Sequence, residues 1–76
     1  MPVMSASQQH RRLLGEAIRA KRKEASLSQE RLAERANLST IFISRVELGK
    51  ESPTMDSLVK IAKALKVRVR DLVSEI

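Results

Sequence analysis

The chain has 76 residues, a net charge of +6 at neutral pH and no cysteine. Its length suits one domain with a modest core, and the lack of cysteine excludes a disulfide framework and a cysteine-based metal site. No apolar run approaches the roughly 18 residues that cross a bilayer, and the polar start is unlike a signal peptide. These features predict a cytoplasmic protein. The basic charge points to a polyanion, with nucleic acid first and an acidic membrane second, and of the two we expect nucleic acid as the partner and no membrane.

The spacing of apolar residues predicts an all-α fold of five short helices. Residues 1–8 are expected to form a flexible N-terminal arm, and residues 9–76 a single domain. The first helix is predicted over 9–25, where Leu14 and Ile18 lie on one apolar stripe and basic residues occupy the opposite side. Glycine and proline are rare, which also favours helix.

The second and third helices are short and lie close together in the sequence. Ser28 is expected to cap the second helix, and Asn37 to end it, because asparagine tolerates the left-handed conformation. Ser39 is expected to begin the third helix, which runs to about Leu48 and ends at Gly49. Only three residues therefore connect the two helices.

The last two helices follow a polar loop. Pro53 and Thr54 mark the start of the fourth helix, in which Met55 and Leu58 begin the predicted apolar stripe. A fifth helix is expected within 69–76, although its start lacks an obvious capping side chain.

The short connection between the second and third helices is typical of a helix-turn-helix. Ala33 is small enough for a crossing helix to approach, and Leu38, Ile43 and Val46 can close the corner. With this motif, residues 14–73 resemble the phage-repressor and Cro family, also called XRE-like. The resemblance is carried by SQERLAERANLSTIFISRVELGK and SPTMDSLVKIAKALKV. It points to small stand-alone members, such as restriction–modification controller proteins and Cro-type repressors, and implies sequence-specific binding of double-stranded DNA.

The resemblance places the outward stripe of the third helix, about residues 39–48, in the DNA major groove. The candidate base-reading residues on or beside this stripe are Thr40, Ile41, Ser44 and Arg45. Ile41 can contact a thymine methyl group, and Arg45 can donate two hydrogen bonds to guanine O6 and N7. The alternative for Ile41 is that it covers a neighbouring side chain or a dimer partner. Phe42 is expected to be a half-buried packing residue.

The resemblance also implies contacts to DNA phosphates, which position a protein without reading sequence. The candidate residues lie at helix starts or just after the third helix: Ser28, Gln29, Ser39, Lys50 and Ser52. Helix N-termini suit this role because their backbone N–H groups are unpaired and carry a partial positive charge. Gln29 is additionally expected to brace the recognition helix.

One acidic residue of the third helix, Glu47, points partly toward the core. A buried carboxylate without a partner is costly. Family members commonly pair the matching glutamate with an arginine late in the first helix, and Arg22 occupies that place. The resemblance therefore implies a structural salt bridge between Arg22 and Glu47.

Three positions depart from the family pattern, in which helices often end on glycine. Ser26, Asn37 and Lys66 stand at these places. In the left-handed conformation, Ser26 and Lys66 would each cost about 1 kcal/mol. The departures concern the helix ends rather than the motif.

A single small module contacts limited DNA surface, which predicts a homodimer on an inverted repeat with half-sites about one helical turn apart. The candidate dimer surface is apolar and lies in the last segment: Val69, Leu72, Val73 and Ile76. The alternative is that the fifth helix only closes the monomer core. A contact with RNA polymerase would need a further surface, for which acidic Glu34 or Glu51 are candidates.

An enzyme is not expected, because His10 stands alone and no clustered carboxylates, glycine-rich loop or nucleophile motif is present. No catalytic residue, metal ligand, cofactor or small-molecule ligand is therefore predicted. Two other functions fit the same fold, since fold does not fix function. One is an antitoxin that represses its own operon while it holds a toxin, and the other is a protein–protein interaction module.

Overall fold

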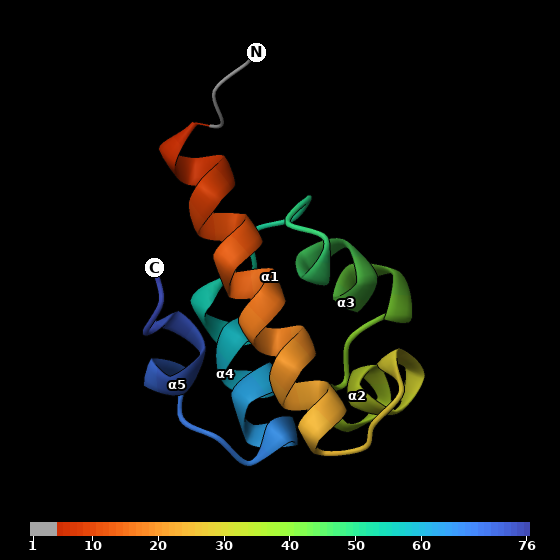
Figure 1. Ribbon diagram of the computed structural model, residues 1–76. Coiled ribbons are helices and arrows are strands. Elements are labelled where there is room, and N and C mark those ends of the chain that lie inside the picture. Colours follow the sequence, from red (N-terminus) through yellow and green to blue (C-terminus); the bar gives the residue numbers. More distant parts are fainter. Residues whose placement is uncertain (1–4) are drawn as a thin grey trace.

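The computed structural model describes residues 5–76, and over this range the chain forms five α-helices. They are α1 (Ala6–Glu24), α2 (Gln29–Ala36), α3 (Thr40–Glu47), α4 (Met55–Leu65) and α5 (Val69–Val73). In Figure 1, α1 runs across the molecule with α2 and α3 on one side and α4 and α5 on the other. None of the described residues is in a strand, and the predicted all-α fold is confirmed.

The core lies where the five helices meet. Each helix contributes one side chain with no exposed surface: Ile18, Leu32, Ile43, Ile61 and Leu72. Neighbouring helices pack in pairs around them, with α1 and α2 both against α3, α2 against α4, and α5 against α1 and α4. Burying each of these side chains contributes roughly 1.5–3 kcal/mol relative to leaving it in water. The position of α3 is therefore fixed by two packed neighbours.

The first helix begins earlier than predicted. The hydroxyl of Ser5 accepts a hydrogen bond from the backbone N–H of Gln8 at 3.2 Å, and the Gln8 side chain accepts one from the Ser5 N–H at 2.9 Å. This reciprocal capping box satisfies two N–H groups and allows the helix to begin at Ala6. Residues 6–8 are thus helical and not part of an arm, and the remainder of the predicted arm, residues 1–4, lies outside the described residues.

Two predictions about the C-terminal third need correction. Met55 does not belong to the buried stripe of α4, because 66% of its surface is exposed and the stripe begins with Leu58. The fifth helix ends at Val73. Its start is stabilised by Asp71, whose carboxylate accepts a hydrogen bond from the backbone N–H of Arg68 at 2.9 Å.

Left-handed residues follow α1, α2 and α4, where the sequence lacks the usual glycine. Ser26, Asn37 and Lys66 have φ angles of 58°, 56° and 59°. The next residue in each case donates its N–H back to the helix; after α4, Val67 donates to the Ala62 carbonyl at 3.0 Å. These bonds close the helix ends, and they require the strained conformation that was expected from the sequence.

Replacing Lys66 by glycine is expected to raise the free energy of unfolding by up to about 1 kcal/mol, because glycine adopts this conformation without a Cβ clash. The extra freedom of glycine in the unfolded chain offsets part of the gain. Urea unfolding measures the difference. The control is Lys63→Gly, which removes the same charge at an exposed position inside α4 and is expected to cost about 1 kcal/mol. Equal losses in both variants would contradict the role assigned to the Lys66 backbone.

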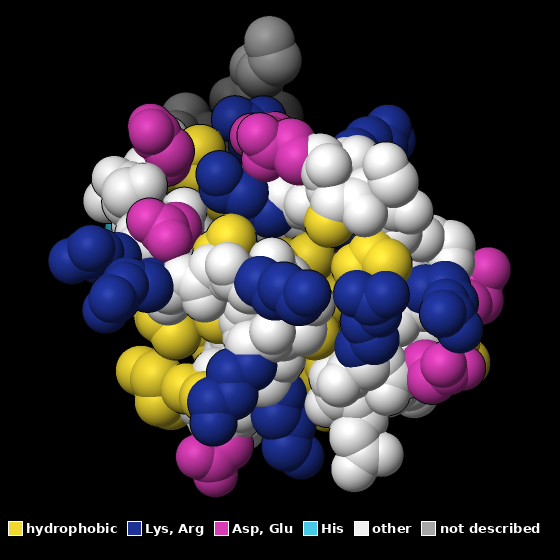
Figure 2. Space-filling view, turned by 90° about the horizontal axis from the view of Figure 1, so that it is seen from below, with side chains coloured by type: hydrophobic (Ala, Val, Ile, Leu, Met, Phe, Trp, Pro, Cys, Tyr) yellow, Lys and Arg dark blue, Asp and Glu magenta, His cyan; other side chains and the backbone are white. Residues whose placement is uncertain are grey.

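The positive charge is distributed outside the helix-turn-helix. Acidic and basic residues balance within 28–52, so the net charge of +6 comes mainly from α1, α4 and the residues around α5. Figure 2 shows the molecule from below, where Lys and Arg side chains are widespread and acidic side chains lie mostly near the edge of the view. Salt screens interactions between charges more than about 8–10 Å apart. The dispersed charge therefore favours polyanions in general and does not identify individual contact residues.

Candidate nucleic-acid interface

Helix α3 has one face directed into the core and one face directed to solvent. Ile43 and Val46 are buried in the core, and Phe42 is half-buried against it. On the outward face, Ile41 is 74% exposed and Leu48, just after the helix, is 60% exposed. The short helix thus presents bulky apolar side chains to solvent although its inner face is already well packed.

The four candidate base-reading residues occupy different depths on α3. Ile41 and Arg45 are exposed, one turn apart, whereas Thr40 and Ser44 are half-buried at the margins of the outward face. The outward face of α3 therefore carries an apolar group and a guanidinium as neighbours.

Helix α1 approaches α3 unusually closely at Gly15, a residue that the sequence reasoning did not single out. A Cβ added to Gly15 would lie 2.6 Å from the carbonyl oxygen of Glu47 and closer still to that of Val46. Only a residue without a side chain allows this contact between backbones. A glycine inside a helical pattern was the available signal, because it lowers helix propensity and needs a packing reason.

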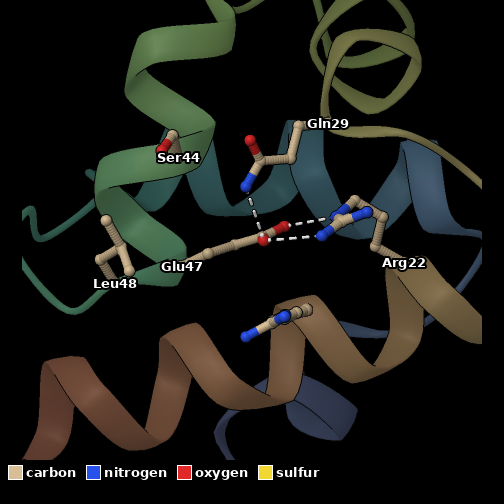
Figure 3. Close-up of a pocket in the computed structure, with 6 residues that line it drawn as sticks. Arg22, Gln29, Ser44, Glu47 and Leu48 are labelled. Atoms are coloured by element: carbon tan, nitrogen blue, oxygen red, sulfur yellow. Dashed lines mark hydrogen bonds and ion pairs between the residues drawn. The ribbon is translucent and has the colours of Figure 1, made fainter.

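Arg22, Glu47 and Gln29 join α1, α2 and α3 at one point (Figure 3). The Arg22 guanidinium donates from Nε to Glu47 Oε2 at 2.7 Å and from Nη2 to Glu47 Oε1 at 3.0 Å. Gln29 Nε2 donates to the same Oε1 at 3.0 Å. The exposed fractions of the Arg22 and Glu47 side chains are only 11% and 3%. The expected ion pair is present, and Gln29 links the start of α2 to α3 through it.

The charge of Arg22 is secured by this arrangement. The hydrogen bond to Glu47 raises the pKa of Arg22 above its ordinary value, although burial acts in the opposite direction. Arg22 Nη1 also donates to the Leu27 carbonyl at 2.9 Å, which fastens the connection between α1 and α2. Within the described residues, no buried side-chain polar atom lacks a hydrogen-bond partner.

An open cavity of about 210 Å³ lies beside this network. Its walls come from α1, from the first residue of α2 and from α3 with the residue after it: Arg19, Arg22, Gln29, Ser44, Glu47 and Leu48. Figure 3 shows Gln29 and Arg22 at the Glu47 carboxylate, with Ser44 and Leu48 to the side on α3. The cavity therefore lies between the start of α2 and the exposed part of α3.

The candidate phosphate-contacting residues lie at the expected helix ends. The hydroxyls of Ser28 and Ser39 accept hydrogen bonds from the backbone N–H of residues 31 and 42, at 3.1 and 3.0 Å. Each is thus an N-cap and retains its O–H as a donor. Lys50 and Ser52 are exposed in the loop after α3.

The structure corrects the candidate dimer surface. Leu72 has no exposed surface and closes the core of the monomer, so it is unavailable to a partner. Val69 and Val73 are half-buried against the same core, and Ile76 is 48% exposed. The short α5 has its central apolar side chain directed inward, which the spacing of apolar residues alone did not distinguish from an outward direction.

The sequence reasoning also missed the partner of Arg45. Arg45 Nε donates to Glu51 Oε1 at 3.2 Å, and Nη2 donates to the Lys50 carbonyl at 3.2 Å. Both side chains remain about half exposed.

Metal-binding clusters and membrane-spanning helices are both absent from residues 5–76. No group of three or more His, Cys, Asp or Glu side chains in this range is arranged to hold a metal ion. None of the helices over the same residues is long and apolar enough to cross a membrane.

Known proteins share both this sequence pattern and this fold. The family model described as helix-turn-helix (HTH_3) matches residues 18–72. The immunity repressor protein of Bacillus phage phi105 is 39% identical over 62 residues, covering 82% of this chain and 43% of the repressor. The chain spans less than half the length of the first curated relatives that it matches.

Two solved structures extend the comparison. The restriction–modification controller protein C.AhdI from Aeromonas hydrophila matches with a TM-score of 0.80 and 31% identity, covering 82% of this chain and 94% of that protein. The P22 c2 repressor in complex with a synthetic operator matches with a TM-score of 0.78 and 31% identity, covering 84% and 97%. Together these matches show that the chain belongs to the XRE-like helix-turn-helix family of repressors and controller proteins.

Proposed function

We propose that the chain is a transcriptional regulator that binds a specific double-stranded DNA sequence with α3 in the major groove. One observation carries this proposal: Ile41 and Arg45 stand exposed on a helix whose other faces are held by α1 and α2. Such a helix can present base-reading groups without reorganising. The solved P22 c2 repressor, a relative of the same fold, was crystallised with an operator, which supports the proposal.

Phosphate contacts complete the proposed binding mode. The N-termini of α2 and α3 offer backbone N–H groups and the O–H donors of Ser28 and Ser39, and Gln29 retains a second amide N–H beside them. Lys50 and Ser52 extend this set beyond α3. These groups position the protein on DNA and add no sequence preference.

Dimerisation on an inverted repeat remains part of the proposal. A single module of this size buries about 600–1,000 Å² on DNA, which is little for a specific complex. Val69, Val73 and Ile76 are the remaining candidates for the partner surface, since Leu72 is buried. Two copies related by a two-fold axis would read half-sites about one helical turn apart.

The deciding experiment is selection of bound sequences from random duplex DNA, followed by anisotropy titrations at two salt concentrations. Enrichment of an inverted repeat, with affinity that survives physiological salt, is the expected result. If no sequence is enriched and binding disappears with salt, the proposal is wrong. The fold would then serve as a protein–protein interaction module.

Alanine substitutions should separate reading from positioning. Ile41→Ala and Arg45→Ala are expected to relax preference at two different base pairs, with about 1–3 kcal/mol lost for a bidentate arginine–guanine contact. Lys50→Ala should weaken binding to every sequence alike and reduce the salt dependence. Competition titrations against single-base operator variants measure both effects. Uniform weakening by Arg45→Ala would contradict its role as a base reader.

A further inference from the structure

The guanidinium of Arg45 is held at one edge in the free protein. Its Nε and Nη2 each donate one hydrogen bond, to the Glu51 carboxylate and the Lys50 carbonyl, both at 3.2 Å. The Arg45 and Glu51 side chains are 49% and 41% exposed. The arginine that faces the proposed groove is therefore not a free surface side chain.

Both acceptors come from a turn built onto the end of α3. Gly49 has a φ of 74°, a conformation that favours glycine. This residue reverses the chain, so that the Lys50 N–H donates to the Arg45 carbonyl at 2.9 Å. The loop consequently folds back along the last turn of the recognition helix. Arg45 therefore contacts the loop twice: its carbonyl accepts from the Lys50 N–H, and its side chain donates to the loop.

A count of hydrogen-bond donors shows what remains for DNA. A guanidinium has five N–H groups in a planar fork. The Nε–H and one Nη2–H of Arg45 are engaged, which leaves the other Nη2–H and both Nη1–H groups. The free donors form the end of the fork, and they suit two parallel hydrogen bonds to guanine O6 and N7.

We propose that Glu51 is a positioning residue that orients Arg45 for its guanine, an inference that rests on the proposed function. Glu51 accepts from Nε and so fixes the plane of the guanidinium. The free end of the guanidinium must lie in the plane of the guanine for both hydrogen bonds to form. Without it, the long arginine side chain samples other rotamers and can turn to a phosphate or another base. Glu51 thus increases the discrimination between guanine and other bases.

The energetics separate this role from a structural one. Ion pairs exposed to this degree contribute little to folding, so loss of Glu51 leaves the domain folded. Ordering one long side chain before binding is worth about two- to tenfold in an equilibrium. The carboxylate also repels nearby phosphates, so its removal raises affinity for all DNA. Glu51 is therefore expected to raise the preference for guanine and to lower the affinity for all DNA.

The experiment measures the affinity of Glu51→Ala, Glu51→Gln and Glu34→Ala for two DNA duplexes. One is the selected operator, and the other is a copy in which one base pair is changed. The changed base pair is the one at which Arg45→Ala relaxes the preference. Glu34→Ala is a matched control because it also removes one negative charge from an exposed ion pair. Glu34 lies on α2 and pairs with Arg31 at 3.1 Å. Glu51→Ala is expected to lower the preference two- to tenfold and to raise affinity for the mismatched DNA. Glu51→Gln keeps an acceptor for Nε and should retain the preference. Glu34→Ala should leave the preference unchanged.

A second measurement needs no DNA. In NMR spectra of the free protein, the Nε–H of Arg45 should exchange with water slowly in the wild type and in Glu51→Gln, and rapidly in Glu51→Ala. Rapid exchange in the wild type overturns the inference, as does a Glu51→Ala variant that keeps its full preference for guanine. A wild-type protein without any sequence preference overturns the proposed function and this inference together.

Discussion

Replacing Arg22 with alanine is expected to lower the free energy of unfolding by at least about 3 kcal/mol. The substitution leaves the Glu47 carboxylate buried without its charge partner, and removal of one member of a buried pair typically costs about 3–5 kcal/mol. It also removes the donor to the Leu27 carbonyl. For a domain of this size, the loss corresponds to a melting temperature about 12–24 °C lower. Thermal unfolding by circular dichroism measures it.

A matched arginine tests whether burial causes the effect. Arg31 bonds Glu34 at 3.1 Å, a distance comparable to that of the buried pair, but the two side chains are 59% and 71% exposed. Arg31→Ala is expected to cost no more than about 1 kcal/mol. Arg22→Lys, which keeps the charge but not the planar fork, should fall between the two alanine variants. A melting temperature unchanged by Arg22→Ala would show that Glu47 does not depend on its partner.

Local rules predicted much of the fold from the sequence. Ser28, Ser39 and Thr54 each cap the helix that follows, because a short side-chain oxygen can accept an N–H three residues later. Asn37 ends α2 in the left-handed conformation. These outcomes depend on a few neighbouring residues, so the printed sequence contains the necessary information.

Predictions failed where an outcome depends on packing between distant segments. Leu72 and Ile76 share the helical spacing of apolar residues, yet one fills the core and the other is exposed. Met55 has the right spacing but lies at the very start of α4, where its side chain is not covered. Spacing identifies an apolar stripe, but it cannot say how far along the helix the neighbouring helices extend.

The candidate site was predicted to a similar extent. The resemblance placed Ile41 and Arg45 on the outward face, and the structure leaves both exposed. It did not indicate Glu51, because the contact depends on the path that the chain takes after Gly49. It did not indicate Gly15, whose role exists only where two helices cross.

Gly15→Ala is expected to destabilise the domain by up to about 3 kcal/mol, although alanine is the better helix former. The added Cβ would meet backbone carbonyl oxygens of Val46 and Glu47 at less than contact distance. Backbone atoms cannot rotate away as a flexible side chain can, so α1 and α3 must separate. Overpacking of this kind typically costs about 1–3 kcal/mol, and urea unfolding measures the loss.

The sign of the change distinguishes this reason from simple helix propensity. In a solvent-exposed helix interior, replacing glycine by alanine stabilises by about 1 kcal/mol. Ala20→Gly, at an exposed position of the same helix, measures that propensity directly and should cost a similar amount. A Gly15→Ala variant that is more stable than the wild type would therefore refute the close contact between the two backbones.

DNA binding provides a second and independent readout of Gly15. Because α3 carries the proposed base-reading residues, moving it away from α1 also moves it relative to the N-terminus of α2, where phosphate contacts are proposed. At a temperature where both variants are fully folded, Gly15→Ala should weaken operator binding, whereas Ala20→Gly should not. The difference arises because α3 is a rigid reader only as long as α1 supports it along its inner side.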